Sequence, residues 1–155
     1  MTTTAEQMER MRRTADDLAA ALKGMPEAIV AKRPAENAWA AKEVVCHLRD
    51  TEESFMGRFQ TLLANNEPKF LPIDPDAWAR DRQYLRNDAA EALMSFRTKR
   101  EEVLKFLSGL QPEQWERGGL HATRGRMTVK DFVALIAWHD DNHLDQLKRA
   151  LDGKP

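Results

Sequence analysis

The chain has very little cysteine, no long apolar run and no excess of charge of either sign. Cys46 is the one cysteine among 155 residues, so no disulfide can form within the chain, and a reducing compartment is expected. No apolar stretch approaches the roughly 20 residues of a membrane span. The opening residues, MTTTAEQMERMRR, lack the apolar core and cleavage site of a secretory signal. We therefore expect a cytoplasmic protein that does not enter a membrane.

The balanced charge argues against nucleic acid as a partner. Lys and Arg number 24 and Asp and Glu 25, which gives a formal net charge of −1. Proteins that bind phosphate backbones are usually clearly basic, and the short clusters ERMRR and RTKRE are more typical of solvated helix faces. The hydrophobic fraction of 42% and the charged fraction of 32% indicate a globular protein. The length predicts a single domain over residues 1–155.

Long helix-forming stretches, separated by clusters of Gly and Pro, indicate an all-α protein without evident strands. We predict four helices, at about residues 4–23, 37–64, 87–108 and 128–152. Asn87 and Thr128 are the predicted N-caps of the third and fourth helices. Helices of this number and length predict a four-helix bundle. The link at residues 65–86 is long enough to return along the bundle, so the second and third helices can run parallel.

The stretch WHDDNHLDQL in the last helix carries polar residues on its apolar side. An advance of 100° per residue places His143 and Asp140 within the apolar arc and His139 at its edge. One buried histidine would be unremarkable, but three polar groups on one apolar face need partners at the same time.

The second and third helices show the same pattern. His47 lies on the flank of the apolar arc of the second helix, and Thr51 and Arg58 lie within it. Arg100 lies among the inward Leu and Phe residues of the third helix. Polar residues on the inner faces of three helices indicate a lined cavity rather than a dry core.

Two histidines four residues apart on a helix can converge on one metal ion, because their Cβ atoms are about 6 Å apart. A third ligand must then come from a facing helix, and His47 is the candidate to join His139 and His143. Three neutral imidazoles leave coordination positions open, which is typical of a catalytic site. Such a centre can hold a hydroxide or a thiolate near neutral pH. The alternative is that the histidines are core or structural residues.

Four other residues are candidates around this site. Asp140 takes the place of Glu in the metalloprotease motif H-E-x-x-H, where it could act as a catalytic residue or orient an imidazole. Arg58 and Arg100 could bind an anionic substrate or cofactor, or extend to the end of the bundle. His121, in the loop GGLHATRGRMT, is expected to be exposed, or else to reach the mouth of a cavity. Cys46 and the tryptophans are expected in packing.

Two stretches of the sequence resemble the DinB-like family of metal-binding four-helix proteins, which includes the YfiT-like hydrolases. ENAWAAKEVVCHL resembles the segment with a tryptophan ahead of the helix that carries the first ligand, His47. GLHATRGRMTVKDFVALIAWHDDNHLDQL resembles the loop and last helix that carry His139 and His143. The third-helix stretch with Arg100 is a looser match, and together these segments cover most of residues 36–151.

The resemblance implies an up-down-down-up four-helix bundle, a divalent metal, often zinc or nickel, on the three histidines, and frequently a homodimer. Characterised members of the family include thiol S-transferases and a thiol-dependent maleylpyruvate isomerase. We therefore predict a metal-dependent enzyme that transfers a low-molecular-weight thiol to a small-molecule substrate, with the metal lowering the pKa of the thiol. Two alternatives remain open: a hydrolase with a metal-bound water as nucleophile, and a non-catalytic, stress-associated binding protein.

Overall fold

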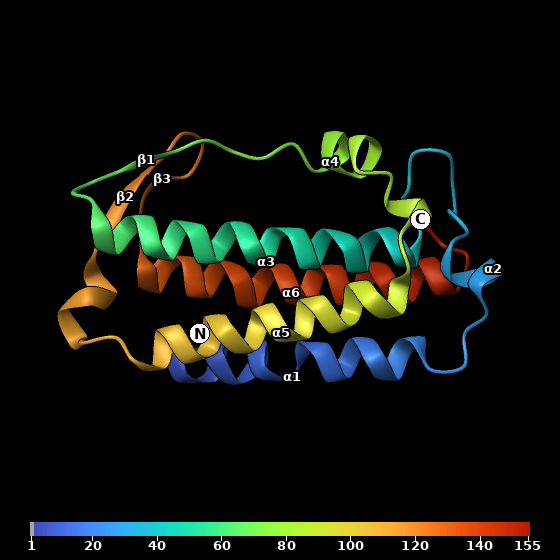
Figure 1. The fold of residues 1–155 in the computed structure, drawn as a ribbon, viewed down its shortest axis with the longest axis horizontal. Helices are drawn as coiled ribbons and strands as arrows, with labels where there is room; N and C mark the ends of the chain where they lie inside the picture. Colours follow the sequence, from blue (N-terminus) through green and yellow to red (C-terminus); the bar gives the residue numbers. More distant parts are fainter. Residues whose placement is uncertain (1) are drawn as a thin grey trace.

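Four long helices dominate the computed structural model, which describes residues 2–155 (Figure 1). They are α1 (Thr4–Leu22), α3 (Ala41–Ala64), α5 (Ala89–Ser108) and α6 (Val129–Leu151). Shorter helical elements lie between them: α2 (Glu27–Val30), α4 (Pro75–Asp81) and the 3-10 helices η1 (Tyr84–Arg86) and η2 (Pro112–Glu116). The predicted four-helix bundle is confirmed, although α3 begins a turn later than the sequence indicated.

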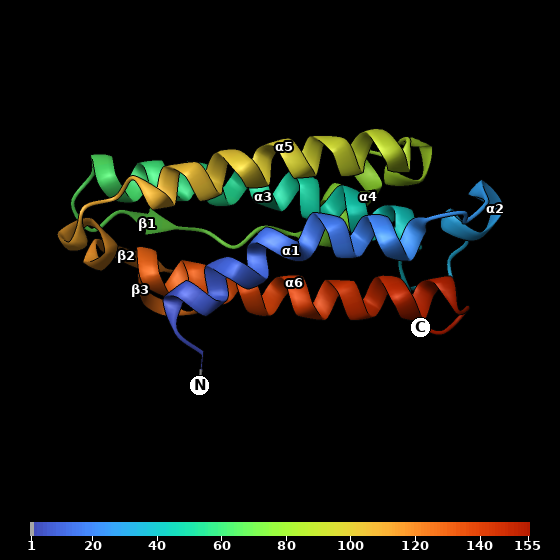
Figure 2. The same ribbon diagram turned by 90° about the horizontal axis from the view of Figure 1, so that it is seen from below.

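The long link between α3 and α5 carries the chain back along the bundle. In Figures 1 and 2, α1 and α6 run in one direction, and α3 and α5 run in the other. Contacts at both ends agree with this arrangement. Near the start of α3, Arg49 donates a hydrogen bond to Asn87, just ahead of α5. Beyond the end of α5, Arg117 donates to the carbonyls of Leu62 and Asn65 at the end of α3.

The structure contains a small three-stranded sheet, whereas the sequence predicts an all-α protein without strands. Its strands are β1 (Lys69–Phe70) in the link, and β2 (Gly118–His121) and β3 (Gly125–Thr128) ahead of α6. β1 pairs in parallel with β2, with Phe70 opposite His121, and β2 and β3 form an antiparallel hairpin. Strands this short leave no readable alternation in a sequence. The sheet ties the link to the hairpin at one end of the bundle.

The ends of the helices follow local signals. Thr128 caps α6 as predicted: its hydroxyl accepts from the N–H of Asp131, whose carboxylate accepts from the N–H of Thr128. Asp88 caps α5, one residue later than predicted, because the side chain of Asn87 accepts a hydrogen bond from Arg49 instead. Asn and Asp are equally good N-caps, so the sequence alone could not separate these neighbours.

The apolar core consists of two clusters with polar side chains between them. One cluster includes Phe59 and Phe132, towards the end that carries the sheet, and the other includes Leu18 and Leu147. Where the chain passes from one cluster to the other, every bundle helix places a buried polar side chain in the interior. These are Thr14 of α1, Glu52 of α3, Arg100 of α5 and Asp140 of α6. The bundle therefore has a polar layer near the middle of its length.

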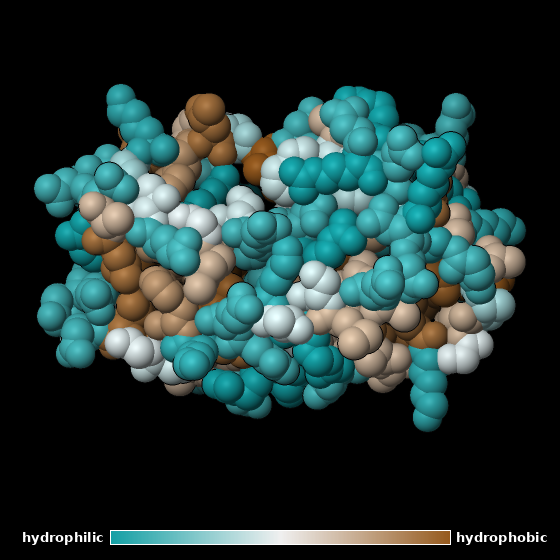
Figure 3. Space-filling view, viewed as in Figure 1, coloured by the Kyte–Doolittle hydropathy of each residue, from teal (hydrophilic) through white to brown (hydrophobic). Residues whose placement is uncertain are grey.

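The face of the molecule seen in Figure 3 is mostly hydrophilic. Figure 3 shows apolar side chains in small, separated patches on the face seen in Figure 1. Trp138 is 60% exposed, so the prediction that the tryptophans are packing anchors is wrong at this position. Among the described residues, no helix is long and apolar enough to cross a membrane.

Candidate metal centre

The three histidines selected from the sequence meet at one point between α3 and α6. His47, His139 and His143 each offer a ring nitrogen, and these atoms all lie within 4.8 Å of one another. The Nε2 atoms of His47 and His139 are 3.1 Å apart. The ring centroids are separated by 4.2 to 5.1 Å. His47 thus reaches the other two rings from its position on the flank of α3.

The donor atoms fit a divalent cation. The facing Nε2 atoms of His47 and His139 would bring two lone pairs together unless a proton or a cation lies between them. Their spacing is close to the roughly 3.3 Å between two nitrogens bound at about 2.0–2.1 Å to a tetrahedral ion. His143 donates from Nδ1 to Oε1 of Gln146 at 2.8 Å, which leaves its Nε2 as a free acceptor. The residues present therefore suit a metal ion.

The surroundings keep all three imidazoles neutral. Burial, and then the neighbouring His143, lower the pKa of His47 to about 3. Burial and the two other rings hold the pKa of His139 well below its usual value. Burial also lowers the pKa of His143, although its bond to Gln146 and the charge of Asp140 act in the opposite direction. Neutral imidazole is the form that binds metals, so these rings are ready ligands at neutral pH.

Asp140 and Arg100 bind each other in the polar layer of the bundle. Arg100 donates to both oxygens of Asp140, at 2.6 and 3.0 Å, and to both oxygens of Glu52, at 2.6 and 3.1 Å. Asp140 also accepts from the hydroxyl of Thr14. We will call these four residues the arginine cluster. Its side chains are almost completely buried.

The arginine cluster changes the roles predicted for two residues. Neither Asp140 nor Arg100 lines the cavity beside the histidines. Both oxygens of Asp140 already have partners in the interior, and Arg100 is held by two carboxylates. This arrangement speaks against Asp140 as a catalytic residue and against Arg100 as a ligand-binding residue. It favours an indirect role, because the charge of Asp140 acts on the nearby His143.

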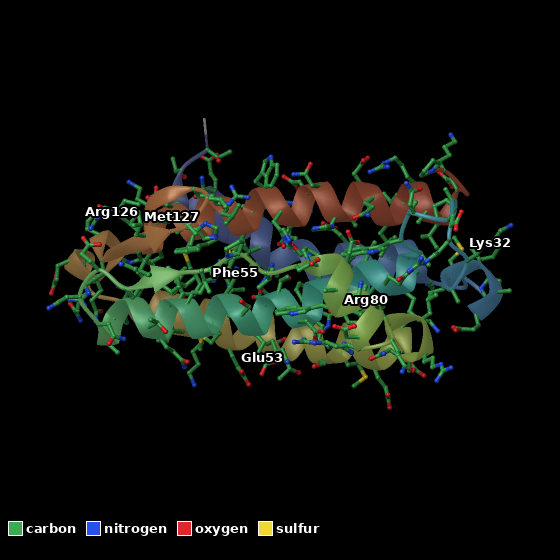
Figure 4. The ribbon with its side chains drawn as sticks, turned by 90° about the horizontal axis from the view of Figure 1, so that it is seen from above. Lys32, Glu53, Phe55, Arg80, Arg126 and Met127 are labelled. Atoms are coloured by element: carbon green, nitrogen blue, oxygen red, sulfur yellow. The ribbon has the colours of Figure 1, made fainter. Side chains whose placement is uncertain are left out.

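A cavity of about 600 Å³ lies beside the three histidines. Its walls come from α3, α6, the link and the β2–β3 hairpin. Seen from above, the segment between β1 and α4 runs between α3 and α6, close to Phe55 (Figure 4). Trp39 forms part of the wall, with its ring centroid 4.9 Å from that of His47 and 6.4 Å from that of His143. The candidate metal centre is therefore open to a small molecule on one side.

The cavity gathers two arginines and a fourth histidine. Arg58 lines it and donates to the carbonyl of Leu71 at 2.8 Å, so its role in ligand binding stays a prediction. His121 also lines it and is only 4% exposed, so it is not the exposed loop residue that we expected first. Arg124, which the sequence analysis did not select, joins them from the hairpin turn. Its one sequence signal is its place in the loop HATRG beside His121.

Cys46 lies away from this chemistry, as predicted. Its side chain is fully buried, and its Sγ lies 3.9 Å from the carbonyl oxygen of Tyr84. Burial raises the pKa of the Cys46 thiol to about 11. A thiol that stays protonated is a poor nucleophile, so Cys46 is a packing residue.

The fold and the three converging histidines define a four-helix-bundle protein with a candidate metal centre. The chain belongs to the DinB superfamily, whose family model matches residues 10–147.

Individual relatives agree with this assignment. A protein from Oceanobacillus iheyensis is 26% identical over 117 residues, which cover 75% of this chain and 66% of the relative. YfiT from Bacillus subtilis is 26% identical over 110 residues, which cover 70% of this chain and 62% of YfiT. Both carry provisional names as metal-dependent hydrolases. The match thus spans slightly less than two thirds of either relative.

The solved structure of YfiT is described as a probable metal-dependent hydrolase with an unusual four-helix bundle topology. It superimposes with a TM-score of 0.86 at 21% identity and covers 95% of this chain and 85% of YfiT. At that identity the likeness establishes the fold.

Proposed function

We propose that this protein is a metal-dependent hydrolase of small-molecule esters or amides, with His47, His139 and His143 as the metal ligands. The observation that carries the proposal is the convergence of three neutral imidazoles beside a cavity of about 600 Å³. A divalent cation held there, for which zinc or nickel is the expected identity, supplies Lewis acidity and a nucleophile at neutral pH. The cavity size suits a small molecule.

The chain's own residues prepare this site in two ways. Gln146 accepts the Nδ1 proton of His143, so the Nε2 of that ring is the ligand atom. The ring of Trp39 lies tilted against that of His47 and nearly parallel to that of His143, and it covers one side of the imidazoles. A preorganised site strengthens the electrostatic interactions on which hydrolysis depends.

The relatives favour hydrolysis over the thiol transfer that we put first from the sequence. The names of two of them assign hydrolase activity provisionally, and none mentions a thiol. A low-molecular-weight thiol as co-substrate therefore becomes an outcome of the test and not part of the proposal.

Metal content and thiol dependence test the proposal together. We expect about one zinc or nickel ion per chain after loading, and its loss in His139→Ala and His143→Ala. The matched control is His121→Asn, which alters a cavity histidine outside the ligand set and should keep the metal. The loaded protein should hydrolyse p-nitrophenyl esters without added thiol. Unchanged metal content in the His139 and His143 variants, or product formation only with a thiol present, would contradict the proposal.

A further inference from the structure

Two arginines in the wall of the cavity form no ion pair with a carboxylate of the described residues. Most arginines of the chain form ion pairs, such as Arg10 with Asp17 and Arg33 with Glu43. Arg58 and Arg124 have no carboxylate oxygen within 4 Å among the described residues, yet both line the cavity.

The side chain of Arg58 is held in place without being neutralised. One terminal nitrogen donates to the carbonyl of Leu71, and the guanidinium lies 5.6 and 5.8 Å from the ring centroids of Phe70 and Phe132. Burial, and then the charge of Arg124, lower the pKa of Arg58, in keeping with an unbalanced positive potential. A preorganised guanidinium with spare N–H donors is suited to binding a carboxylate or a phosphate.

The hairpin places both Arg124 and His121 on the wall of the cavity. The N–H of Ala122 donates to the carbonyl of Phe70 at 3.0 Å, which ties the hairpin to the link. Gly125 has a φ of +78°, a conformation that lets the chain turn directly after Arg124. The backbone N–H of Thr123 donates to Nδ1 of His121 at 3.2 Å, so the neutral ring carries its proton on Nε2.

The cavity contains one acidic lining residue, Asp76, which comes from α4 and not from the hairpin. A divalent cation on the three histidines would add two further positive charges. Clefts lined by charge of one sign concentrate ligands of the opposite sign. A neutral substrate that displaced the water around the half-buried Arg58 would leave its guanidinium without a charged partner, which is costly.

We propose that Arg58 and Arg124, with the Nε2–H of His121, form a subsite for an anionic group, and that the substrate is an anionic small molecule. The group is a carboxylate or a phosphate. Both present a pair of oxygen acceptors that a guanidinium group can bind with two parallel hydrogen bonds. That the bound molecule is a substrate rests on the proposed hydrolase function. The subsite itself does not, because none of its residues is a metal ligand. It predicts binding that depends on Arg58 and Arg124 even without a metal.

Binding of succinate and of inorganic phosphate to the full-length, metal-free chain tests the subsite without catalysis. We expect at least one of the two anions to bind, and the tighter of them identifies the group. Arg58→Gln and Arg124→Gln should each weaken binding by about tenfold or more. Arg13→Gln, which changes an exposed arginine outside this cavity, should leave it unchanged. Equal binding by all four proteins, or no binding of either anion to the parent chain, would overturn the proposal.

A matched pair of esters then links the subsite to hydrolysis in the zinc-loaded protein. The mono-p-nitrophenyl ester of succinic acid is anionic, and methyl p-nitrophenyl succinate is its neutral counterpart. We expect kcat/KM for the anionic ester to fall about tenfold or more in Arg124→Gln, with less than a twofold change for the neutral ester. Because Arg124 is exposed, this variant should fold even if Arg58→Gln does not.

The outcomes of the ester experiment separate the two proposals. Equal kcat/KM for both esters in the parent protein, unaltered in Arg124→Gln, would overturn the anionic subsite and leave the hydrolase proposal standing. Absence of hydrolysis of either ester, together with anion binding that depends on Arg58 and Arg124, would refute the hydrolase proposal and retain the subsite.

Discussion

Two polar groups of residues lie in the interior of the same bundle, and they differ in how their hydrogen bonds are satisfied. In the arginine cluster, Arg100 has two carboxylates and a backbone carbonyl, and Asp140 has a guanidinium and a hydroxyl. In the candidate metal centre, two imidazole nitrogens face each other. Nδ1 of His47 is buried without a hydrogen-bond partner among the described residues. We call the arginine cluster a closed group, because its polar side chains have partners within the protein. The candidate metal centre is an open group, because it has polar atoms without such partners.

This difference distinguishes buried polar residues that stabilise the fold from those that can bind a ligand, which burial alone does not do. Buried polar atoms are nearly always paired, so an unpaired one in a native interior calls for an explanation. The arginine cluster meets its own requirements and has no access to the cavity, which suits a role in holding four helices together. The histidines leave donor atoms unused beside a cavity, which suits a ligand.

The largest effect is expected from breaking the arginine cluster. Arg100→Leu would leave Glu52 and Asp140 buried without a counter-charge, which should cost about 3–5 kcal/mol of unfolding free energy. Urea denaturation of the metal-free protein measures this loss. The triple variant that adds Glu52→Gln and Asp140→Asn should recover part of it, because both buried charges are then removed. A loss below about 1 kcal/mol in Arg100→Leu would mean that the cluster is not the structural element described here.

The next largest effect should come from the candidate metal centre. Unlike the loss in Arg100→Leu, it should appear only when metal is bound. Zinc at about 100 times its Kd should stabilise the parent protein by about 2.7 kcal/mol, and His47→Leu should abolish that gain. Without metal, His47→Leu should change stability by only about 1 kcal/mol, because it removes a single hydrogen bond, between the Nε2 atoms of His47 and His139, and a buried Nδ1 that has no partner. Thermal unfolding with and without zinc provides the measurement. A large loss in the metal-free variant would indicate that His47 is a structural residue.

A smaller effect is expected from the residue that orients one ligand. Gln146→Leu removes the acceptor for Nδ1 of His143, so metal affinity should fall by about tenfold. Gln146→Glu keeps an acceptor at the same place and should retain the affinity. Competition of each variant with a chelating dye for zinc measures the difference. Equal affinity in all three proteins would show that the bond to Gln146 does not position the ring.

The sequence predicted the features that depend on helical periodicity. It placed His139 and His143 on the inner side of the last helix and His47 on the flank of the facing one, and all three meet in the structure. It also placed Asp140 and Arg100 inward, which is correct. Periodicity gives the direction of a side chain and not its partner. The same inward signal therefore applied to Asp140, which belongs to the arginine cluster, and to His143, which belongs to the candidate metal centre.

The remaining features depend on contacts between distant segments. His121 and Arg124 reach the cavity because β2 pairs with β1 in the link, where Phe70 lies opposite His121. Pairing between strands of two and four residues is set by the assembled bundle, and a short sequence window contains no record of it. For this reason the sequence placed Arg124 beside His121 in a loop but did not predict that Arg124 lines the cavity.

The smallest predicted effect concerns a second closed group, one turn along α3 from His47. Burial raises the pKa of Asp50, but hydrogen bonds from Arg49, Tyr84 and Arg82 outweigh it and hold the pKa below its ordinary value. The stability that these bonds provide is therefore present above about pH 4 and is lost as the pH falls through the folded-state pKa. Tyr84→Phe removes the donor that lies 2.7 Å from Asp50 and should cost about 1 kcal/mol at pH 7.

The pH dependence of that cost distinguishes a closed group from an open one. The difference in unfolding free energy between Tyr84→Phe and the parent protein should shrink as Asp50 becomes protonated, below about pH 4. Adding zinc at pH 7 should change the difference much less than the pH does, because Asp50 and Tyr84 do not line the cavity, and the charge of Asp50 affects the pKa of His47 less than burial and His143 do. Denaturant titrations at several pH values, with and without zinc, measure both. If zinc changed the difference as strongly as the pH does, the two groups would be strongly coupled, and the separation between closed and open polar groups would fail.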